Sequence, residues 1–331
     1  KWTRVDFHLD TPAEAMADFE PVDFFVSTHG ANDILIDRIE LYPTDHIDGF
    51  DPEIVQAVKS WKVPLLRGPG GNFVSGYHWR DGVGPRDLRS TRPNLAWGGL
   101  EYNDFGIDEF VKFCRIVGAE PLICVNAGTG KPEEAASWIE YCNGSQDTAM
   151  GRLRTSNGHP EPYGVRYWEV GNELYGCWQQ GNCGSDEYAQ RYKLFAEAMR
   201  KADPDIMLIA NGNPFDFVVP EPHWSFTTAD QRWHRALLSE NAADLEFIAL
   251  HALPENFRRM ENQTDEHAYY GLMAHPHKWE REDIPSLLQL IAECGATDAR
   301  LALTEWGVLG TSPLRPRIDN FGEVVYAGLI L

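Results

Sequence analysis

The sequence predicts an α/β protein: a (β/α)8 barrel of which six strand-and-helix units are visible. Six short, continuous apolar runs lie between residues 46 and 331, and a helical pattern precedes each of them. Continuous apolar runs are typical of parallel strands that protein covers on both faces. Alternating helices and strands favour a parallel sheet. Polar and aromatic residues follow strand after strand, at the end where a (β/α)8 barrel builds its active site.

The chain from residue 46 onwards divides into alternating elements. We expect helices over residues 51–62, 106–118, 131–142, 185–204, 233–243 and 282–295. We expect strands over residues 63–71, 120–128, 165–173, 206–213, 245–253 and 299–307. The last segment, 322–331, has a helical pattern again. Because a complete barrel has eight strands, we expect one strand before these six and one after them to lie outside this sequence.

The first 45 residues have a different pattern. Val5, Phe7 and Leu9 alternate with polar residues, and the turn sequence HGAND leads into a second alternating run, ILIDRIEL. This alternation predicts β-strands, but a few strands alone are too few for an independent domain. We therefore expect residues 1–45 to be the last strands of a β-sandwich and residues 46–331 to be a partial barrel.

The amino-acid composition limits which classes of molecule we expect this protein to bind. The chain has 29 Lys and Arg against 50 Asp and Glu, a formal net charge of −21. Such a charge repels phosphate groups, so we expect neither nucleic acid nor an anionic membrane surface as a partner. No apolar run approaches the roughly 20 residues that cross a bilayer. Aromatic residues make up 12% of the chain, and aromatic rings stack on sugar faces, so this composition suits sugar recognition.

The sequence predicts no metal and no cofactor. No C-x-x-C pair is present, and the glycine-rich segments 68–72 and 128–131 lack the full spacing of a dinucleotide or P-loop signature. Cys177 and Cys183 bracket a short loop, where an oxidising compartment would permit a disulfide, and the sequence leaves open whether they form one. The other four cysteines lie singly in apolar segments, where a buried free thiol is typical: Cys114, Cys124, Cys142 and Cys294.

Two glutamates stand at the carboxyl ends of apolar strands. Glu173 ends the segment WEVGNE, and Glu305 lies in LALTEWG. For a single Glu at the end of a strand, capping a helix or pairing with an Arg is as good an explanation as catalysis. Two of them, three β-units apart, face each other across a barrel mouth, which favours glycoside hydrolysis by paired carboxyl groups. In that chemistry one carboxyl is a protonated acid with a raised pKa and the other is ionised.

Longer motifs resemble a known family. The segments 67–87, 95–106, 118–130 and 168–176 resemble glycoside hydrolase family 51, chiefly α-L-arabinofuranosidases, and the resemblance runs from about residue 35 to the end. It implies a retaining mechanism on a (β/α)8 barrel. It also implies that residues 1–45 end an inserted sandwich, similar to a carbohydrate-binding module, that some members carry after the first barrel strand.

The resemblance also assigns site residues. Glu173 would be the acid/base and Glu305 the nucleophile. Asn172 would hydrogen-bond the 2-hydroxyl of the sugar. The remaining expected sugar contacts are one amide, two indoles and one imidazole: Asn72, Trp97, Trp306 and His251. A lone strand-end His is more often structural, so the role of His251 rests on the resemblance alone.

The sequence departs from the family pattern at two positions. Leu253 stands where the family usually has Tyr, and Thr304 stands where the residue before the nucleophile is often acidic. Both positions bear on substrate choice.

The leading hypothesis is a retaining, exo-acting α-L-arabinofuranosidase on arabinose-containing carbohydrates. The alternatives are an endoglucanase or xylosidase of the same family, and a non-catalytic carbohydrate-binding barrel. A nicotinamide or phosphate enzyme is disfavoured by the missing glycine motif. The sequence leaves open whether the protein forms a homo-oligomer, and it favours a secreted or periplasmic location slightly over a cytoplasmic one.

Overall fold

The computed structural model describes residues 3–9, 23–27, 29–30, 33–217, 231–253, 273–307 and 330. It divides into two units, residues 1–41 and residues 42–331. Among the described residues of the first unit none is assigned to a helix or strand, so the β-sandwich expected there stays a prediction. The helix expected over 322–331 lies outside the described residues, apart from Ile330.

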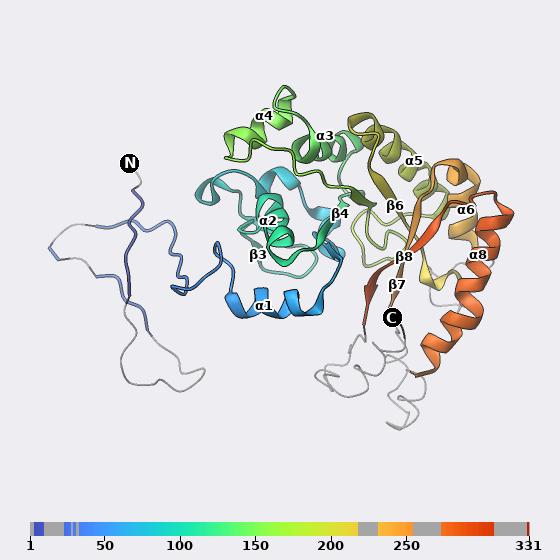
Figure 1. Ribbon diagram of the computed structural model, residues 1–331, viewed down its shortest axis with the longest axis horizontal. Helices are drawn as coiled ribbons and strands as arrows, with labels where there is room; N and C mark the ends of the chain where they lie inside the picture. The colour runs from blue at the N-terminus through green and yellow to red at the C-terminus, as the bar shows by residue number, and fades with distance from the viewer. Residues whose placement is uncertain are drawn as a thin grey trace. The chain divides into compact units, whose positions relative to one another are not determined.

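A sheet of six parallel strands forms the centre of the second unit, as the barrel prediction requires (Figure 1). The strands follow one another in the order β1-β4-β5-β6-β7-β8, so each new strand pairs with the one before it. Their bounds are β1 Leu65–Arg67, β4 Glu120–Val125, β5 Tyr167–Val170, β6 Met207–Asn211, β7 Phe247–Ala252 and β8 Arg300–Trp306. All six predicted strands are present but shorter, because the residues that follow each strand turn into loops.

Helices connect these strands and lie outside the sheet in Figure 1. The six predicted helices are confirmed: α1 Pro52–Trp61, α2 Ile107–Val117, α3 Pro132–Asn143, α5 Ser185–Ala202, α6 Arg232–Asn241 and α8 Ile284–Glu293. A π-helical turn, η8 Trp279–Asp283, leads into α8, and η6 Ala242–Asp244 follows α6. None of the described helices is long and apolar enough to cross a membrane.

The prediction missed helix α4, Ala149–Ser156, and the hairpin of β2 Arg92–Pro93 and β3 Leu100–Glu101. The α4 segment contains few apolar residues, so it carries no amphipathic signal. A buried guanidinium anchors it instead: Arg154 donates hydrogen bonds to the backbone carbonyls of Tyr141, His159 and Pro160. Such long-range contacts are invisible in a local pattern.

Buried aromatic rings fill the space between the sheet and its helices. Trp168 of β5 packs edge-on against Trp138 of α3, and Tyr188 of α5 stacks on Trp233 of α6 with ring centroids 4.7 Å apart. All four side chains are buried. These aromatic residues therefore pack the helices against the sheet. They leave the carboxyl ends of the strands to polar residues.

Candidate active site

The carboxyl ends of the strands bring five polar residues together. Arg67 ends β1, Glu169 lies within β5, His251 lies in β7 and Glu305 lies in β8. Glu173 follows β5 after a tight turn. Since all these strands are parallel, their carboxyl ends meet at one edge of the sheet, which is where (β/α)8 proteins place their catalytic groups.

The turn after β5 holds Glu173 in a left-handed backbone conformation. Its φ is +46°, and Gly171 two residues earlier has a φ of +82°. Residues other than glycine rarely adopt such angles, and strain of this kind clusters at functional sites. The turn is fixed from β6, because the buried backbone N–H of Leu174 donates to the side-chain oxygen of Asn211 at 2.8 Å.

Arg67 links three side chains at this edge. Its Nη1 donates to Oε1 of Glu305 at 2.7 Å, its Nη2 donates to Oδ1 of Asn172 at 2.8 Å, and its Nε pairs with Glu169. Burial lowers the pKa of Arg67, but the charges of Glu169 and Glu305 raise it above its usual value. The guanidinium therefore stays charged and orients the Glu305 carboxylate.

Glu173 accepts three hydrogen bonds. Trp178 Nε1 donates to Oε2 at 2.8 Å, while the Tyr175 hydroxyl and His251 Nδ1 lie 3.2 Å and 2.9 Å from Oε1. Burial raises the pKa of this carboxyl, but the hydrogen bonds from His251, Trp178 and Tyr175 outweigh burial and lower it. The raised pKa expected for the acid is therefore wrong for the free protein, because these donors stabilise the ionised form.

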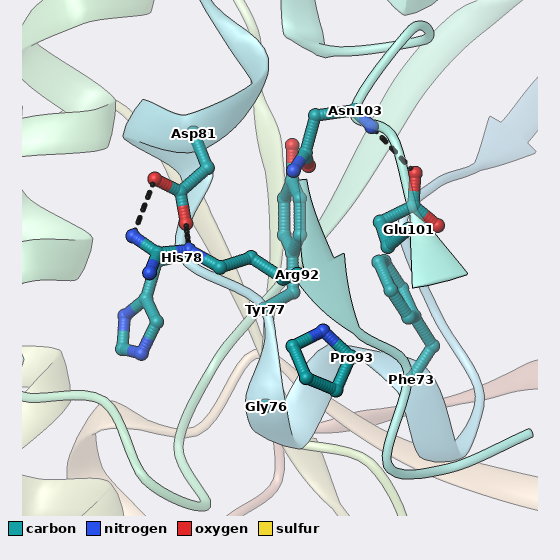
Figure 2. A pocket seen from close by; sticks show the side chains of 9 residues that line it. All are labelled: Phe73, Gly76, Tyr77, His78, Asp81, Arg92, Pro93, Glu101 and Asn103. Atoms are coloured by element: carbon teal, nitrogen blue, oxygen red, sulfur yellow. Dashed lines mark hydrogen bonds and ion pairs between the residues drawn. The ribbon is translucent and has the colours of Figure 1, made fainter. Parts of the chain in front are cut away.

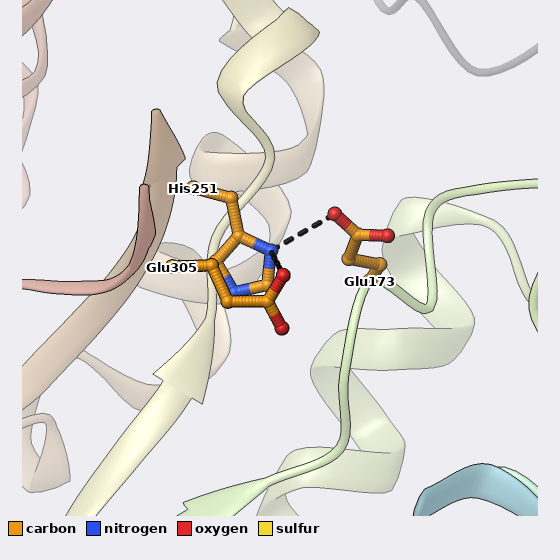
Figure 3. A group of neighbouring side chains, drawn as sticks. All are labelled: Glu173, His251 and Glu305. Atoms are coloured by element: carbon orange, nitrogen blue, oxygen red, sulfur yellow. Dashed lines mark hydrogen bonds and ion pairs between the residues drawn. The ribbon is translucent and has the colours of Figure 1, made fainter. Parts of the chain in front are cut away.

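The imidazole of His251 approaches both carboxylates through its Nδ1 (Figure 3). Its Nδ1 is 2.9 Å from Oε1 of Glu173 and 3.8 Å from Oε2 of Glu305. Burial lowers the pKa of the imidazole, but the hydrogen bond to Glu173 and the negative charges of Glu305 and Glu173 raise it above its usual value. In the free protein these shifts favour an ionised Glu173 and a protonated His251.

Each of these three residues has a ligand-type atom, and the three atoms lie within 4.8 Å of one another. Three such ligands are enough for a cation in principle. Here Arg67 already pairs with Glu305, and the imidazole already pairs with Glu173. A cation would have to displace both, so the arrangement fits acid–base chemistry better than metal binding.

The other expected site residues differ in position. Asn172 is fully buried and contacts both Arg67 and Gln179. Asn72 begins the short helix η1 Asn72–Gly76, and its backbone carbonyl accepts from Gln179. Gln179 thus connects the Asn172 side chain to the start of η1.

The two tryptophans are exposed. Trp306 ends β8 beside Glu305 and is 45% exposed, whereas Trp97 lies in the β2–β3 loop and is 70% exposed. No contact joins Trp97 to the carboxylate pair among the described residues. Between β5 and α5, Cys177 and Cys183 are free thiols.

A cavity of about 330 Å³ lies next to η1 (Figure 2). Phe73 and Tyr77 contribute its aromatic wall, and an ion pair between Asp81 and Arg92 borders it. Neither Glu173 nor Glu305 lines this cavity. This cavity is therefore not formed by the two carboxylates of the candidate site.

The sequence prediction gave no role to Arg67, Glu169, Tyr175 or Trp178. One signal was available, since Glu169 is a charged residue inside an apolar strand and is fully buried. A buried carboxylate needs a partner, and Arg67 is that partner. Tyr175 and Trp178, which donate to Glu173, gave no local signal, because aromatic residues in a loop do not by themselves indicate a hydrogen-bond partner.

Residues 57–281 match the family described as the alpha-L-arabinofuranosidase 1 domain. This match covers more than half of the chain. The chain belongs to this family. The resemblance to arabinofuranosidases of glycoside hydrolase family 51, inferred from the motifs, is thereby confirmed.

Named arabinofuranosidases are similar to this chain. Alpha-L-arabinofuranosidase C of Emericella nidulans is 49% identical over 170 residues, which are 51% of this chain and 34% of that protein. The intracellular exo-alpha-(1->5)-L-arabinofuranosidase of Acetivibrio thermocellus is 37% identical over 217 residues, 66% of this chain and 41% of that protein. The chain thus spans less than half the length of these curated relatives.

A solved arabinofuranosidase has the same fold. The alpha-L-arabinofuranosidase of Thermotoga maritima, in an arabinose complex, superposes with a TM-score of 0.69 at 35% identity, over 89% of this chain and 57% of that one. The parallel sheet is therefore that of an arabinofuranosidase-family barrel.

Proposed function

We propose that this protein is a retaining, exo-acting α-L-arabinofuranosidase that releases terminal arabinofuranosyl residues from arabinose-containing polysaccharides or oligosaccharides. The observation that carries the proposal is the spacing of Glu173 and Glu305, which offer oxygens within 4.8 Å of each other. Retaining glycosidases hold their two carboxyl groups about 5–5.5 Å apart, whereas inverting enzymes need more room for a water.

In the first step Glu305 is the nucleophile. Arg67 holds its Oε1, which leaves Oε2 to form a bond to the anomeric carbon of the sugar. The bond between that carbon and the leaving oxygen breaks, and a proton passes through Glu173 to the leaving oxygen. The product is a covalent glycosyl-enzyme.

In the second step Glu173 is the general base. Its carboxylate takes a proton from a water, and the water oxygen attacks the anomeric carbon and releases Glu305. Two displacements restore the original configuration. The three donors around Glu173 support this step, because they stabilise the ionised form that a base requires.

Asn172 and Asn72 would orient the sugar. The Asn172 amide is held from one side by Arg67 and from the other by Gln179, so its position is fixed before substrate arrives. A hydrogen bond to the 2-hydroxyl strengthens in the transition state and lowers the barrier. The exo-action and the arabinose specificity rest on the names of the similar proteins.

The proposed substrate is tested with the full-length protein on three aryl glycosides: α-L-arabinofuranoside, β-D-xyloside and β-D-glucoside. We expect kcat/KM to be highest for the arabinofuranoside. Glu305→Gln serves as the matched control, because it keeps the size of the side chain and should abolish turnover of all three substrates. A higher kcat/KM for the xyloside or glucoside would contradict the arabinofuranosidase assignment.

A further inference from the structure

A continuous hydrogen-bonded chain joins Glu169 to Glu173 through two side chains. The Thr304 hydroxyl is 3.2 Å from Oε1 of Glu169, and the same oxygen is 3.1 Å from Nε2 of His251. On the other side of the ring, Nδ1 lies 2.9 Å from Glu173. Glu169 and His251 are buried, so bulk water does not replace these partners.

The number of hydrogens available to this series of hydrogen bonds determines whether the imidazole is neutral or protonated. A threonine hydroxyl has one hydrogen, and the Thr304 hydrogen is donated to Glu169. Its oxygen can then only accept from His251, so Nε2 must carry a hydrogen. The Glu173 carboxylate also only accepts, so Nδ1 must carry one too. A ring that donates from both nitrogens is an imidazolium.

The opposite arrangement is disfavoured. A neutral His251 would need the Thr304 hydroxyl to turn and donate to Nε2. Glu169 Oε1, which is fully buried, would then lose the hydrogen bond that it accepts from Thr304. Leaving a buried carboxylate oxygen without that donor is costly, so the hydroxyl stays on Glu169.

The backbone explains why Thr304 reaches the ring. The register between β7 and β8 shifts after Leu250, which pairs with Leu303, so that His251 pairs with Glu305. Thr304 is the extra residue of this irregularity. Such bulges re-aim side chains next to active sites. Here the shift places both Thr304 and Glu305 beside the same imidazole.

We propose that Thr304 is a positioning residue that keeps His251 as an imidazolium, and that His251 stores the proton that Glu173 delivers to the leaving oxygen. The proposal rests on the proposed function. In the first step the Nδ1–H bond breaks, the Glu173 carboxylate takes this proton and passes it to the leaving oxygen, and His251 becomes neutral. In the second step Glu173 takes a proton from water and returns it to Nδ1.

The charges around His251 agree with this role. Glu173 and Glu305 approach Nδ1, Glu169 acts through Thr304, and Arg67 is the opposing cation. Burial lowers the pKa of His251, but the hydrogen bond to Glu173 and the charges of Glu305 and Glu173 outweigh both burial and Arg67, so the pKa is raised. When Glu305 becomes an ester in the glycosyl-enzyme, one of these negative charges disappears. The imidazolium is then less stabilised, at the stage when its proton has to be released.

The first experiment measures the protonation of His251 without using activity. The full-length protein is labelled with ¹⁵N-histidine, and the ring nitrogens of His251 are followed by NMR across pH, with His251→Gln to assign them. We expect both nitrogens of the wild type to carry hydrogen at pH 6.5. Thr304→Val keeps the shape but removes the hydroxyl, and should lower the His251 pKa by about one unit or more. Thr304→Ser should restore it.

The second experiment measures kcat/KM of the same variants against pH, because this profile reports the free enzyme. Thr304→Val should move the alkaline limb to lower pH by the shift that NMR measures, and Thr304→Ser should not. A merely structural role would lower kcat/KM equally at every pH. If the wild-type ring is neutral at pH 6.5, or if Thr304→Val leaves its pKa unchanged, the proposal is wrong.

The two measurements separate this proposal from the proposed function. A protein that turns over no arabinofuranoside, but whose His251 titrates as expected, would contradict the proposed function and support the role of Thr304. Arabinofuranosidase activity in a protein whose His251 is neutral would support the proposed function and contradict the role of Thr304. Should Thr304→Val fail to fold, Thr304→Ala also removes the hydroxyl, and it should lower the His251 pKa in the same way; an unchanged pKa in that variant would contradict the proposal.

Discussion

At the scale of single residues, the central feature is that Glu173 and His251 share one proton. Hydrogen bonds from Trp178 and Tyr175 favour the Glu173 carboxylate, and the surrounding negative charges favour the imidazolium. An acid that is ionised at rest is consistent with catalysis if the proton is stored 2.9 Å away. Glu173 can then serve as acid and as base with no change in its own resting state.

Replacing Glu173 tests its role as the proton donor. We expect Glu173→Ala to slow natural substrates by at least about 10²-fold, the lower range for general acid catalysis. An aryl substrate with a dinitrophenolate leaving group needs no proton, so its glycosylation step should survive far better. Azide needs no base, and should restore turnover and give a glycosyl azide of retained configuration.

Glu305→Ala is the matched comparison for this experiment. It removes the nucleophile, so azide should yield only an inverted product. Equal losses of Glu173→Ala on every leaving group, with no azide rescue, would mean that Glu173 is structural.

The same pair makes stability depend on pH. The pKa of His251 is raised above 6.5, so its contribution is present below pH 6.5 and is lost as pH rises through the folded-state pKa. The pKa of Glu173 is lowered below 4.5, so its contribution is present above pH 4.5 and is lost as pH falls through its folded-state pKa. The pair therefore stabilises the fold most between these values.

We expect the loss of unfolding free energy in His251→Gln to be largest between about pH 4.5 and 6.5. Denaturant unfolding at a series of pH values measures it. Introducing His251→Gln into a Glu173→Gln background is the control, because the partner charge is already absent and the pH dependence should largely disappear. A loss that is the same at all pH values in both backgrounds would show that the pair is not ionised.

At the scale of elements, the turn between β5 and Glu173 positions the acid. Gly171 has a φ of +82°, and a Cβ at this position would lie 2.7 Å from Cδ1 of Leu174. The turn is therefore closed to larger residues by both backbone conformation and space. The alignment of Glu173 with the strand end therefore depends on Gly171 as well as on the hydrogen bond from Leu174 to Asn211.

We expect Gly171→Ala to destabilise the protein and to lower kcat/KM by displacing Glu173. Gly295→Ala is the matched control: its φ is +76°, but no atom lies within 4 Å of the added Cβ. Both variants carry backbone strain of about 1–2 kcal/mol, and only Gly171→Ala adds a collision at the site. Equal kcat/KM in the two variants, measured on an aryl arabinofuranoside, would show that the turn does not position Glu173.

The strands themselves were predictable because both of their faces are covered, which leaves continuous apolar runs in the sequence. Strand ends were less predictable, since the polar residues after them are placed by partners on other strands. The β7–β8 register shift gives no local signal. This is why Thr304 was seen only as a departure from a family pattern, although the structure places it against His251.

At the scale of the whole molecule, parallel order explains how a site forms from residues far apart in sequence. Arg67 and Glu305 are 238 residues apart, yet they share a hydrogen bond. They come from β1 and β8, the two edge strands in the sheet order. A flat sheet would hold its edges apart, so this contact requires the sheet to curve towards closure, as in a barrel. The sequence pattern predicted the alternation of helices and strands, and the motifs predicted a site at Glu173 and Glu305. The hydrogen bond between Arg67 and Glu305 could not be predicted in this way, because it depends on the curvature of the sheet.

The central claim is that Glu305 attacks the sugar across the mouth of this sheet. The most direct measurement treats the full-length protein with a 2-fluoro-arabinofuranosyl donor that carries a good leaving group, and identifies the labelled peptide by mass spectrometry. We expect one covalent sugar per molecule on Glu305, and no label on that peptide in Glu305→Gln. A sugar attached reproducibly to another carboxylate, or full hydrolysis by Glu305→Gln, would contradict the account.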